Sequence, residues 1–171
     1  MNRRYCIPIL VCAFILVFAL GLTVSAAPKL AMVTGRVSVP GYASWPTAAG
    51  AVTLTDCKTG YTVSVTPQGD TFTVPWPVGK CSIRLRAGNT LAVVRAVKVK
   101  GKGAVVNFGT LVPGDVNGDN ISDVYDWWAL EPSINHGAPC ALCDVNYDGQ
   151  VTEDDLFAML RQGITSGETC P

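Results

Sequence analysis

Two acidic stretches near the end of the chain restrict its fold more than any other feature. The first, DVNGDNISDVYD, runs from residue 115 to 126, and the second, DVNYDGQVTEDD, runs from 144 to 155. Each alternates short oxygen-bearing side chains along a turn-forming sequence. Calcium takes six to eight oxygen ligands in a flexible cage, and a twelve-residue loop of this composition supplies them. The repeat therefore predicts two Ca²⁺ sites, one in each loop.

The expected ligands fall on the same positions of both loops. Positions 1, 3, 5, 9 and 12 supply side chains, and position 7 supplies a backbone carbonyl. In the first loop these are Asp115, Asn117, Asp119, Asp123 and Asp126, with the carbonyl of Ile121. In the second they are Asp144, Asn146, Asp148, Thr152 and Asp155, with the carbonyl of Gln150. Position 6, where the loop turns sharply, is Asn120 or Gly149, and both residue types tolerate a positive φ.

Neither loop is preceded by the helix of an ordinary EF-hand. Pro113 and Gly114 stand directly before the first loop and are incompatible with an entering helix. Position 12 is Asp in both loops, where ordinary EF-hands use Glu. We expect exiting helices at 127–131, ended by Pro132, and at 156–161. Each repeat is therefore a loop followed by a helix.

This pattern, GDVNGD followed about thirty residues later by DVNYDG, resembles a type I dockerin over residues 113–171. The resemblance implies calcium-dependent folding and high-affinity docking onto a cohesin module, usually in extracellular polysaccharide-degrading assemblies. Many dockerins carry a small hydroxyl pair at loop positions 10 and 11, facing the cohesin. Here these positions are Val124-Tyr125 and Glu153-Asp154, so the identity of the partner does not follow.

The start of the chain has the pattern of an export signal. Two arginines are followed by an apolar run over 5–24 and by Ser25-Ala26-Ala27, which predicts a cleaved signal peptide at 1–27. An uncleaved signal anchor is the alternative, because the run approaches the length that spans a bilayer. No later segment is apolar enough to span a membrane. We expect an extracellular or cell-surface protein without a stable membrane span after cleavage.

Charge divides the remaining chain into two parts. Residues 28–112 hold ten Lys or Arg against two Asp, a balance of +8, whereas 113–171 hold eleven Asp or Glu against one Arg, a balance of −10. Opposite balances predict a boundary near Pro113 and two modules. The acidic module, 113–171, should be loosely folded until calcium neutralises it.

The basic module, 28–112, has the alternation of half-buried strands. Expected strands are 32–39, 51–55, 61–66, 71–74, 82–86, 91–99 and 104–108. About seven short strands predict a β-sandwich. Residues 68–74 and 78–85 resemble carboxypeptidase-regulatory-like and prealbumin-like sandwiches, which implies a noncatalytic spacer, adhesive or binding module. The expected fold class is multi-domain, an all-β sandwich plus a small α-helical dockerin-like calcium-binding domain.

Five cysteines follow the signal segment, and in an exported protein they are expected to form disulfides. Cys57 and Cys81 are expected to pair, because the basic module has no other cysteine. Cys170 is expected to bridge Cys140 or Cys143, leaving one thiol over. The alternative is a zinc site formed by Cys140 and Cys143, which only Cys170 and the single histidine, His136, could complete.

No catalytic arrangement is visible, so we do not expect an enzyme. The single histidine lies in a Gly/Pro-rich linker, and most carboxylates belong to the predicted calcium loops. Nucleic acid is not an expected partner, because aromatic residues do not interleave with the basic ones. Lys98, Lys100 and Lys102 alternate along one strand end and could share a face with Arg84 and Arg86. This basic face is either an ordinary solvated surface, which is the favoured interpretation, or a site that attracts an acidic wall polymer or the protein's own acidic module.

The large aromatic and apolar side chains of the two modules could pack in a core or face a ligand or partner. Trp45 and Trp76, each followed by Pro, could stack on sugar rings or pack in a core. Most of the apolar residues Trp127, Trp128, Phe157 and Met159 are expected to form the core of the acidic module, with one or two facing a partner.

Three hypotheses of function follow from these patterns. The leading one is a secreted noncatalytic protein that docks onto a cohesin-type module through its calcium-dependent tail. The second is a stand-alone surface or matrix protein whose calcium repeats fold back on the basic sandwich. The third is a carbohydrate-binding module that uses Trp45 or Trp76 to hold a polysaccharide.

Overall fold

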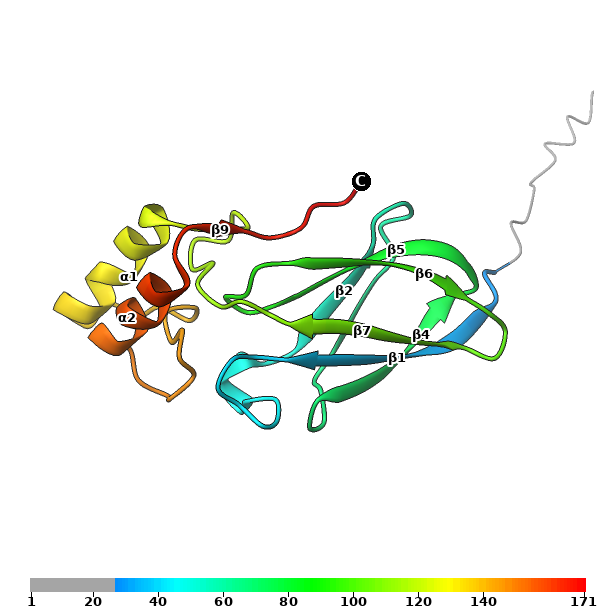
Figure 1. Cartoon of the computed structure of the whole chain (residues 1–171), viewed down its shortest axis with the longest axis horizontal. Coiled ribbons are helices and arrows are strands. Elements are labelled where there is room, and N and C mark those ends of the chain that lie inside the picture. The colour runs from blue at the N-terminus through cyan, green and yellow to red at the C-terminus, as the bar shows by residue number, and fades with distance from the viewer. Residues whose placement is uncertain (1–26) are drawn as a thin grey trace, which may run out of the picture.

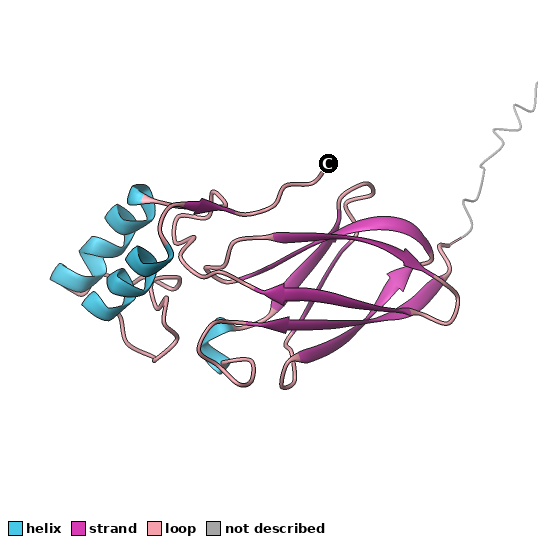
Figure 2. Ribbon diagram, in the orientation of Figure 1, coloured by secondary structure: helices cyan, strands magenta, loops and turns pink. Residues whose placement is uncertain are grey.

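A computed structural model describes residues 27–171 of the chain, so the predicted signal peptide lies outside the described residues except for its last position. The described chain has a two-layered β structure at one end and two helices at the other (Figure 1). Strands make up most of the first part, and the two α-helices lie close together in the second (Figure 2). None of the helices between residues 27 and 171 has the length and apolar character needed to cross a bilayer.

Seven strands form two facing sheets. They are β1 (Leu30–Ser38), β2 (Val52–Asp56), β3 (Thr62–Val65), β4 (Thr71–Pro77), β5 (Gly79–Ala87), β6 (Val93–Val99) and β7 (Ala104–Thr110). One sheet has the order β4-β1-β7 and the other β3-β2-β5-β6. The pairs are antiparallel except β1–β7, which is parallel. The predicted β-sandwich is confirmed, and each expected strand is present with bounds that differ by a few residues.

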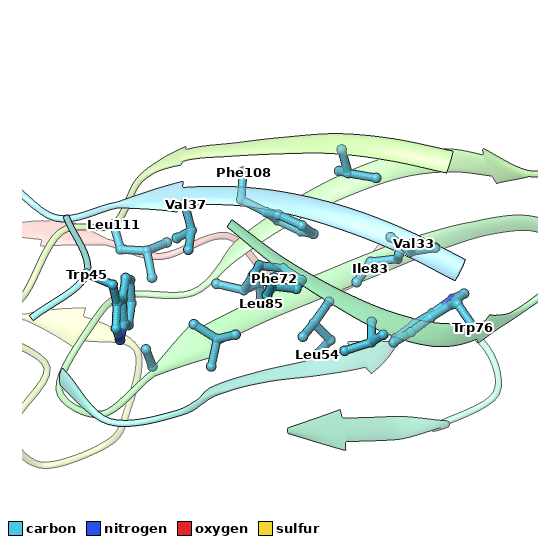
Figure 3. Close-up of a cluster of buried hydrophobic side chains, with 14 of the residues drawn as sticks. Val33, Val37, Trp45, Leu54, Phe72, Trp76, Ile83, Leu85, Phe108 and Leu111 are labelled. Atoms are coloured by element: carbon cyan, nitrogen blue, oxygen red, sulfur yellow. The ribbon is translucent and has the colours of Figure 1, made fainter. Parts of the chain in front are cut away.

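The sandwich core is filled by residues that alternate along the strands and point between the sheets. Figure 3 shows Phe72 and Trp76 from β4, Leu54 from β2 and Phe108 from β7 lying along this core. Alternation places every second side chain of a strand on the inner face, so the hydrophobic period of 2 in the sequence becomes one apolar layer. A short 3₁₀ helix, η1 (Thr47–Ala49), closes one end of the layer.

Two tryptophans proposed as sugar-stacking residues belong to this core. Trp76 is 0% exposed and Trp45 is 8% exposed. The Trp45 Nε1 donates to the carbonyl of Gly50 at 2.8 Å, which satisfies the one polar atom of its ring. Neither ring is open to a polysaccharide, so the carbohydrate-binding hypothesis that depends on them is wrong.

Gly35 in β1 is required by a close approach across the sheet. It pairs with Phe72, and a Cβ at this position would overlap the ring of Phe72. The ring of Phe72 in turn packs on Phe108, with 5.9 Å between ring centroids, so a shift of this ring would disturb the sandwich core. We expect Gly35→Ala to lower the free energy of unfolding by about 2 kcal/mol, measured by denaturant titration. The matched control is Arg36→Ala on the exposed face of the same strand, and equal stability of the two variants would contradict this account.

The acidic module contains two helices and a two-residue ladder. These are α1 (Val124–His136), α2 (Glu153–Gln162), β8 (Ile121–Ser122) and β9 (Thr165–Ser166), with β8 and β9 antiparallel. Within the described chain, residues 111–120 form no helix, as predicted from Pro113 and Gly114. The predicted helix after the second loop is confirmed. Each repeat is a loop followed by a helix.

Helix α1 is longer than predicted, because it continues through Pro132 to His136. Proline removes one hydrogen bond and crowds the carbonyl four residues earlier, which is that of Trp128. Trp128 lies on an exposed face, 62% exposed, where water can bind the freed carbonyl. Buried Leu130 and Ser133 anchor the helix on either side of the proline. The helix instead ends at Gly137, whose φ of 63° and bond to Ser133 form the C-terminal cap.

Candidate functional site

Both acidic loops fold around their own side chains with one pattern of hydrogen bonds. The carboxylate at position 1 accepts from the backbone N–H of position 6 and of position 4 or 5. Position 3 accepts from position 5, and position 5 accepts from position 7. All of these bonds are 2.8 to 3.0 Å long. The alternation of Asp and Asn read from the sequence is therefore what shapes each loop.

Positions 4 and 6 of each loop adopt a positive φ. The residues are Gly118 (91°), Asn120 (71°), Tyr147 (58°) and Gly149 (90°). The predicted left-handed conformation of Asn120 and Gly149 is confirmed. Tyr147 is unexpected in this region of φ, because a bulky side chain is disfavoured there.

Position 12 closes each loop onto its helix. Asp126 and Asp155 are fully buried. Each accepts the backbone N–H groups of positions 2, 3 and 9, at 2.7 to 3.0 Å. Position 9, which is Asp123 or Thr152, caps the N-terminus of α1 or α2. One carboxylate therefore ties the start of the loop to the first turn of the helix.

The carboxylates at position 1 carry an electrostatic cost. Burial raises the pKa of Asp115 above its ordinary value, against the opposing charge of Arg86. Burial also raises the pKa of Asp144, and the neighbouring charges of Asp155 and Asp148 add to the shift. Removing a carboxylate from water disfavours its charged form unless a cation or hydrogen bonds compensate. A bound divalent ion would offset this cost in both loops.

The predicted ligand atoms are of the chemical type that calcium prefers. Every predicted ligand atom is an oxygen of a carboxylate, amide, hydroxyl or carbonyl group, which suits Ca²⁺ rather than a softer metal. Carboxylate oxygens that accept backbone N–H groups keep lone pairs for a metal. In residues 27–171 no three Asp, Glu, His or Cys side chains gather into one cluster, so each loop would need its Asn, Thr and carbonyl oxygens as well.

The disulfides differ from the predicted pairing. Cys57 is bonded to Cys170, and Cys140 to Cys143, which leaves Cys81 as the free cysteine of the described chain. The predicted Cys57–Cys81 bridge and the predicted bridge from Cys170 to Cys140 or Cys143 are therefore wrong. The zinc alternative is wrong too, because cysteines in a disulfide are not thiolate ligands.

Strand alternation explains why Cys57 does not bond to Cys81. The Cys57 N–H donates to the carbonyl of Ser82, so Cys57 lies opposite Ser82 across the β2–β5 pair. Opposite residues share one face of a sheet, and Ser82 points outward. Cys81 shares its parity with the buried Ile83 and points inward.

The C-terminal segment supplies the actual partner of Cys57. After α2 it runs back over the sandwich toward β5 (Figure 1). Glu168 fixes its path, because its N–H donates to Ala92 and its carboxylate pairs with Arg95 at 3.0 Å. This path ends with the Cα atoms of Cys57 and Cys170 at 5.3 Å.

Asn89, between β5 and β6, connects the sandwich to both loops. Its buried amide Nδ2 donates to the carbonyls of Leu142 and Asp144, at 2.9 and 3.0 Å. Its Oδ1 accepts from the Tyr147 hydroxyl at 2.6 Å, and its carbonyl accepts from the Asp115 N–H. Tyr147 thus turns toward the sandwich core, which accounts for a tyrosine at loop position 4.

Replacing Asn89 should loosen the contact between the modules. Asn89→Ala leaves two carbonyls and the Tyr147 hydroxyl without a partner in a buried site, so we expect a loss of about 3 kcal/mol in unfolding free energy. Denaturant unfolding in calcium measures it. Gln68→Ala, an exposed amide whose side chain forms no hydrogen bond among the described residues, is the control and should change stability by less than about 0.5 kcal/mol. Equal effects of the two substitutions would contradict the role given to Asn89.

The acidic module touches the sandwich at three further places. Arg86 forms an ion pair with Asp115 at 2.8 Å. The Tyr42 hydroxyl donates to the carbonyl of Asn146 at 2.7 Å. The side chain of Asn120 accepts from the backbone of the segment before β6. The two acidic loops therefore contact the sandwich, as the second hypothesis requires of its repeats.

The two helices expose an apolar surface, here named the helix surface. Its exposed residues are Val124, Tyr125, Trp127, Trp128, Phe157, Leu160 and Ile164. A groove of about 220 Å³ between α1 and α2 is lined by some of them, with Met159 at its base. Tyr125 and Trp128 pack edge to face, with 5.4 Å between ring centroids.

The sequence predicted that most of four apolar helix residues form the core of this module, and that prediction is wrong. The four are Trp127, Trp128, Phe157 and Met159. Only Met159 of the four residues in question is buried. The small core of the module is filled instead by Val116, Leu130, Cys143, Val145 and Met159. Large apolar side chains that remain exposed together are typical of a surface that binds another molecule.

Comparison with known proteins identifies a related fold. No family model and no curated protein matches the chain. Several solved structures do, and two of them are interface mutants of a type II cohesin–X-dockerin complex from Acetivibrio cellulolyticus. One matched chain has 18% identity and a TM-score of 0.56, over 77% of this chain and 94% of its own. The other has 17% identity and a TM-score of 0.55, over 82% and 97%.

At this level of identity the likeness concerns the fold alone. It supports a β-sandwich of the kind found in cohesin–dockerin complexes. The sandwich from β1 to β7 is less than half of the 171 residues, so a match over 77% of the chain includes residues of the acidic module as well. The proteins in those complexes bind one another as modules.

Proposed function

We propose that this chain is a secreted, noncatalytic docking protein that binds a cohesin-type module through its calcium-stabilised acidic module. The observation that carries the proposal is the helix surface, which presents exposed Tyr125, Trp127 and Trp128 beside the two loops. Buried aromatic anchors dominate the energy of many protein interfaces, and tryptophan and tyrosine are prominent among them. The likeness to chains of cohesin–X-dockerin complexes supports a docking role.

Calcium would act on this surface through the helix starts. Bound to the side chains at positions 1, 3, 5, 9 and 12, the ion would offset part of the negative charge of each loop. Asp126 and Asp155 already join each loop to the first turn of its helix. Holding the loops therefore holds α1 and α2 at the spacing that forms the groove. The proposed partner would recognise the helices, with the ions out of direct contact.

The disulfides support an extracellular location. Two are formed in the described chain, and disulfides persist in oxidising compartments. Together with the signal pattern at 1–27, they favour export. The Cys57–Cys170 bond also ties the end of the acidic module to the sandwich.

A capture experiment tests the docking function. The secreted chain is passed over a panel of immobilised cohesin modules, in millimolar calcium and in chelator. We expect retention by at least one cohesin in calcium, loss of retention in chelator, and at least tenfold weaker binding of Trp128→Ala. Met32→Ala, an exposed apolar residue of β1, is the matched control and should bind normally. Retention that is insensitive to both chelator and Trp128→Ala would overturn the proposal.

In a second candidate function, the chain is the cohesin-like partner of the complex and its sandwich binds a dockerin. Val105 of β7 is 77% exposed, and Met32 lies on the same outer face of the β4-β1-β7 sheet. In this case the sandwich would act as the cohesin-like partner and receive a dockerin. Capture by immobilised dockerins that is abolished by Val105→Glu and unaffected by Trp128→Ala would favour it. If neither the cohesin panel nor the dockerin panel retains the chain, the hypothesis of a stand-alone surface or matrix protein remains.

A further inference from the structure

The first calcium loop contains a positive charge that comes from the sandwich. Arg86 of β5 places its Nη2 2.8 Å from Asp115 Oδ2, and its Nη1 donates to the carbonyl of Gly118 at 3.2 Å. The carboxylate of Asp115 is fully buried, whereas the arginine side chain is about one quarter exposed. The guanidinium thus reaches in from the edge of the sandwich and holds positions 1 and 4 of the loop together.

The second loop has no such charge. Within residues 27–171 the ion pairs are Arg86–Asp115 and Arg95–Glu168, and neither involves the second loop. Asp144, its position 1, accepts from the backbone N–H groups of Asp148 and Gly149. This loop contacts the sandwich through neutral groups, the hydroxyls of Tyr42 and Tyr147 and the amide of Asn89. The two loops share their backbone hydrogen bonds, but only the first has a cationic side chain, Arg86, at its position 1 carboxylate.

We propose that Arg86 is a built-in counter-ion of the first loop, which makes the two calcium sites unequal and couples the first one to the sandwich. The inference rests on the calcium binding proposed above. A guanidinium and Ca²⁺ at one carboxylate repel each other, and the repulsion is weakly screened because the carboxylate is buried. The first loop therefore binds calcium less tightly than the second. Because Arg86 also binds Asp115 and the carbonyl of Gly118 when no ion is present, the first loop stays ordered in the absence of calcium.

This coupling has a reciprocal consequence. If the Arg86–Asp115 contact weakens calcium binding, calcium in turn weakens that contact by the same factor. Filling the first site then loosens one of the attachments between the modules, while Asn89 and the Cys57–Cys170 bond remain. The first loop responds to calcium at higher concentration, and the second is filled first.

Calorimetric titration of the full secreted chain with CaCl₂ tests the inequality. In the wild type we expect two sites whose dissociation constants differ by tenfold or more. Arg86→Gln should tighten the weaker site by about tenfold and leave the stronger one unchanged. Arg86→Lys, which keeps the charge, should remain closer to wild type. Arg84→Gln is the matched control, since Arg84 lies on the same face of β5 and forms no ion pair among the described residues.

Amide hydrogen exchange in chelator provides a readout that needs no calcium. Gly118 and Asn120 donate to Asp115, so Arg86→Gln should speed their exchange by tenfold or more. Asp148 and Gly149, the matching amides of the second loop, should be unaffected. Unchanged exchange at Gly118 and Asn120, or equal calcium affinities in Arg86→Gln and the wild type, would overturn the inference alone. Absence of calcium binding in the wild type would instead refute the proposed calcium function with it.

Discussion

Replacing Cys170 with serine should lower the free energy of unfolding by about 4 kcal/mol. The Cys57–Cys170 bond joins residues 113 positions apart, and closing so long a loop removes much conformational freedom from the unfolded chain. In its absence the C-terminal segment is held mainly by the exposed Glu168–Arg95 pair and a few backbone bonds. Denaturant unfolding of the oxidised protein measures the loss.

Cys81→Ser is the matched control for this prediction. It removes the unpaired thiol and should cost about 1 kcal/mol or less. The pairing expected from sequence, Cys57 with Cys81, gives the opposite order of stabilities. A large loss in Cys81→Ser with a small one in Cys170→Ser would therefore refute the observed pairing, and peptide mapping without reduction would identify the bond directly.

Replacing Asp155 with alanine should remove one calcium ion and about 4 kcal/mol of stability in millimolar calcium. A ligand present at a thousand times its dissociation constant stabilises a protein by about 4 kcal/mol, which is lost with the site. Three backbone N–H groups also lose the carboxylate that accepts from them, so the start of α2 should fray even in chelator. Thermal unfolding with and without calcium separates the two contributions.

Its neighbour Asp154 provides the comparison. Asp154 is exposed, stands at position 11 and accepts no hydrogen bond that closes the loop, so Asp154→Ala should keep both ions and nearly the full stability. If Asp155→Ala bound two calcium ions as the wild type does, position 12 would not be a ligand. The loop assignment would then be wrong for the second repeat.

Local patterns in the sequence predicted what local geometry determines. The strands follow from a period of 2, since each residue's face depends only on its neighbours along the chain. The positive φ predicted at position 6 of each loop likewise depends on residues within one loop. The twelve predicted ligands occupy the expected loop positions for this reason. Whether they bind calcium stays a prediction.

Features that depend on distant residues were not predicted. Cys57 and Cys170 meet because the C-terminal segment returns over the sandwich, and nothing near either cysteine indicates that path. Trp127 and Trp128 were assigned to the core, because the sequence does not state that Leu130 and Met159 already fill it. Nothing in the sequence around Arg86 or Asn89 indicated that these residues contact the acidic loops. One clue was present in Tyr147, a bulky residue at a position that requires a positive φ.

Calcium titration of the full secreted chain, combined with amide exchange of α1 and α2, tests the central claim most directly. The account predicts two ions bound per chain and slower exchange in both helices once the sites are filled. A chain that takes up no calcium, with identical helix exchange in calcium and in chelator, would contradict it.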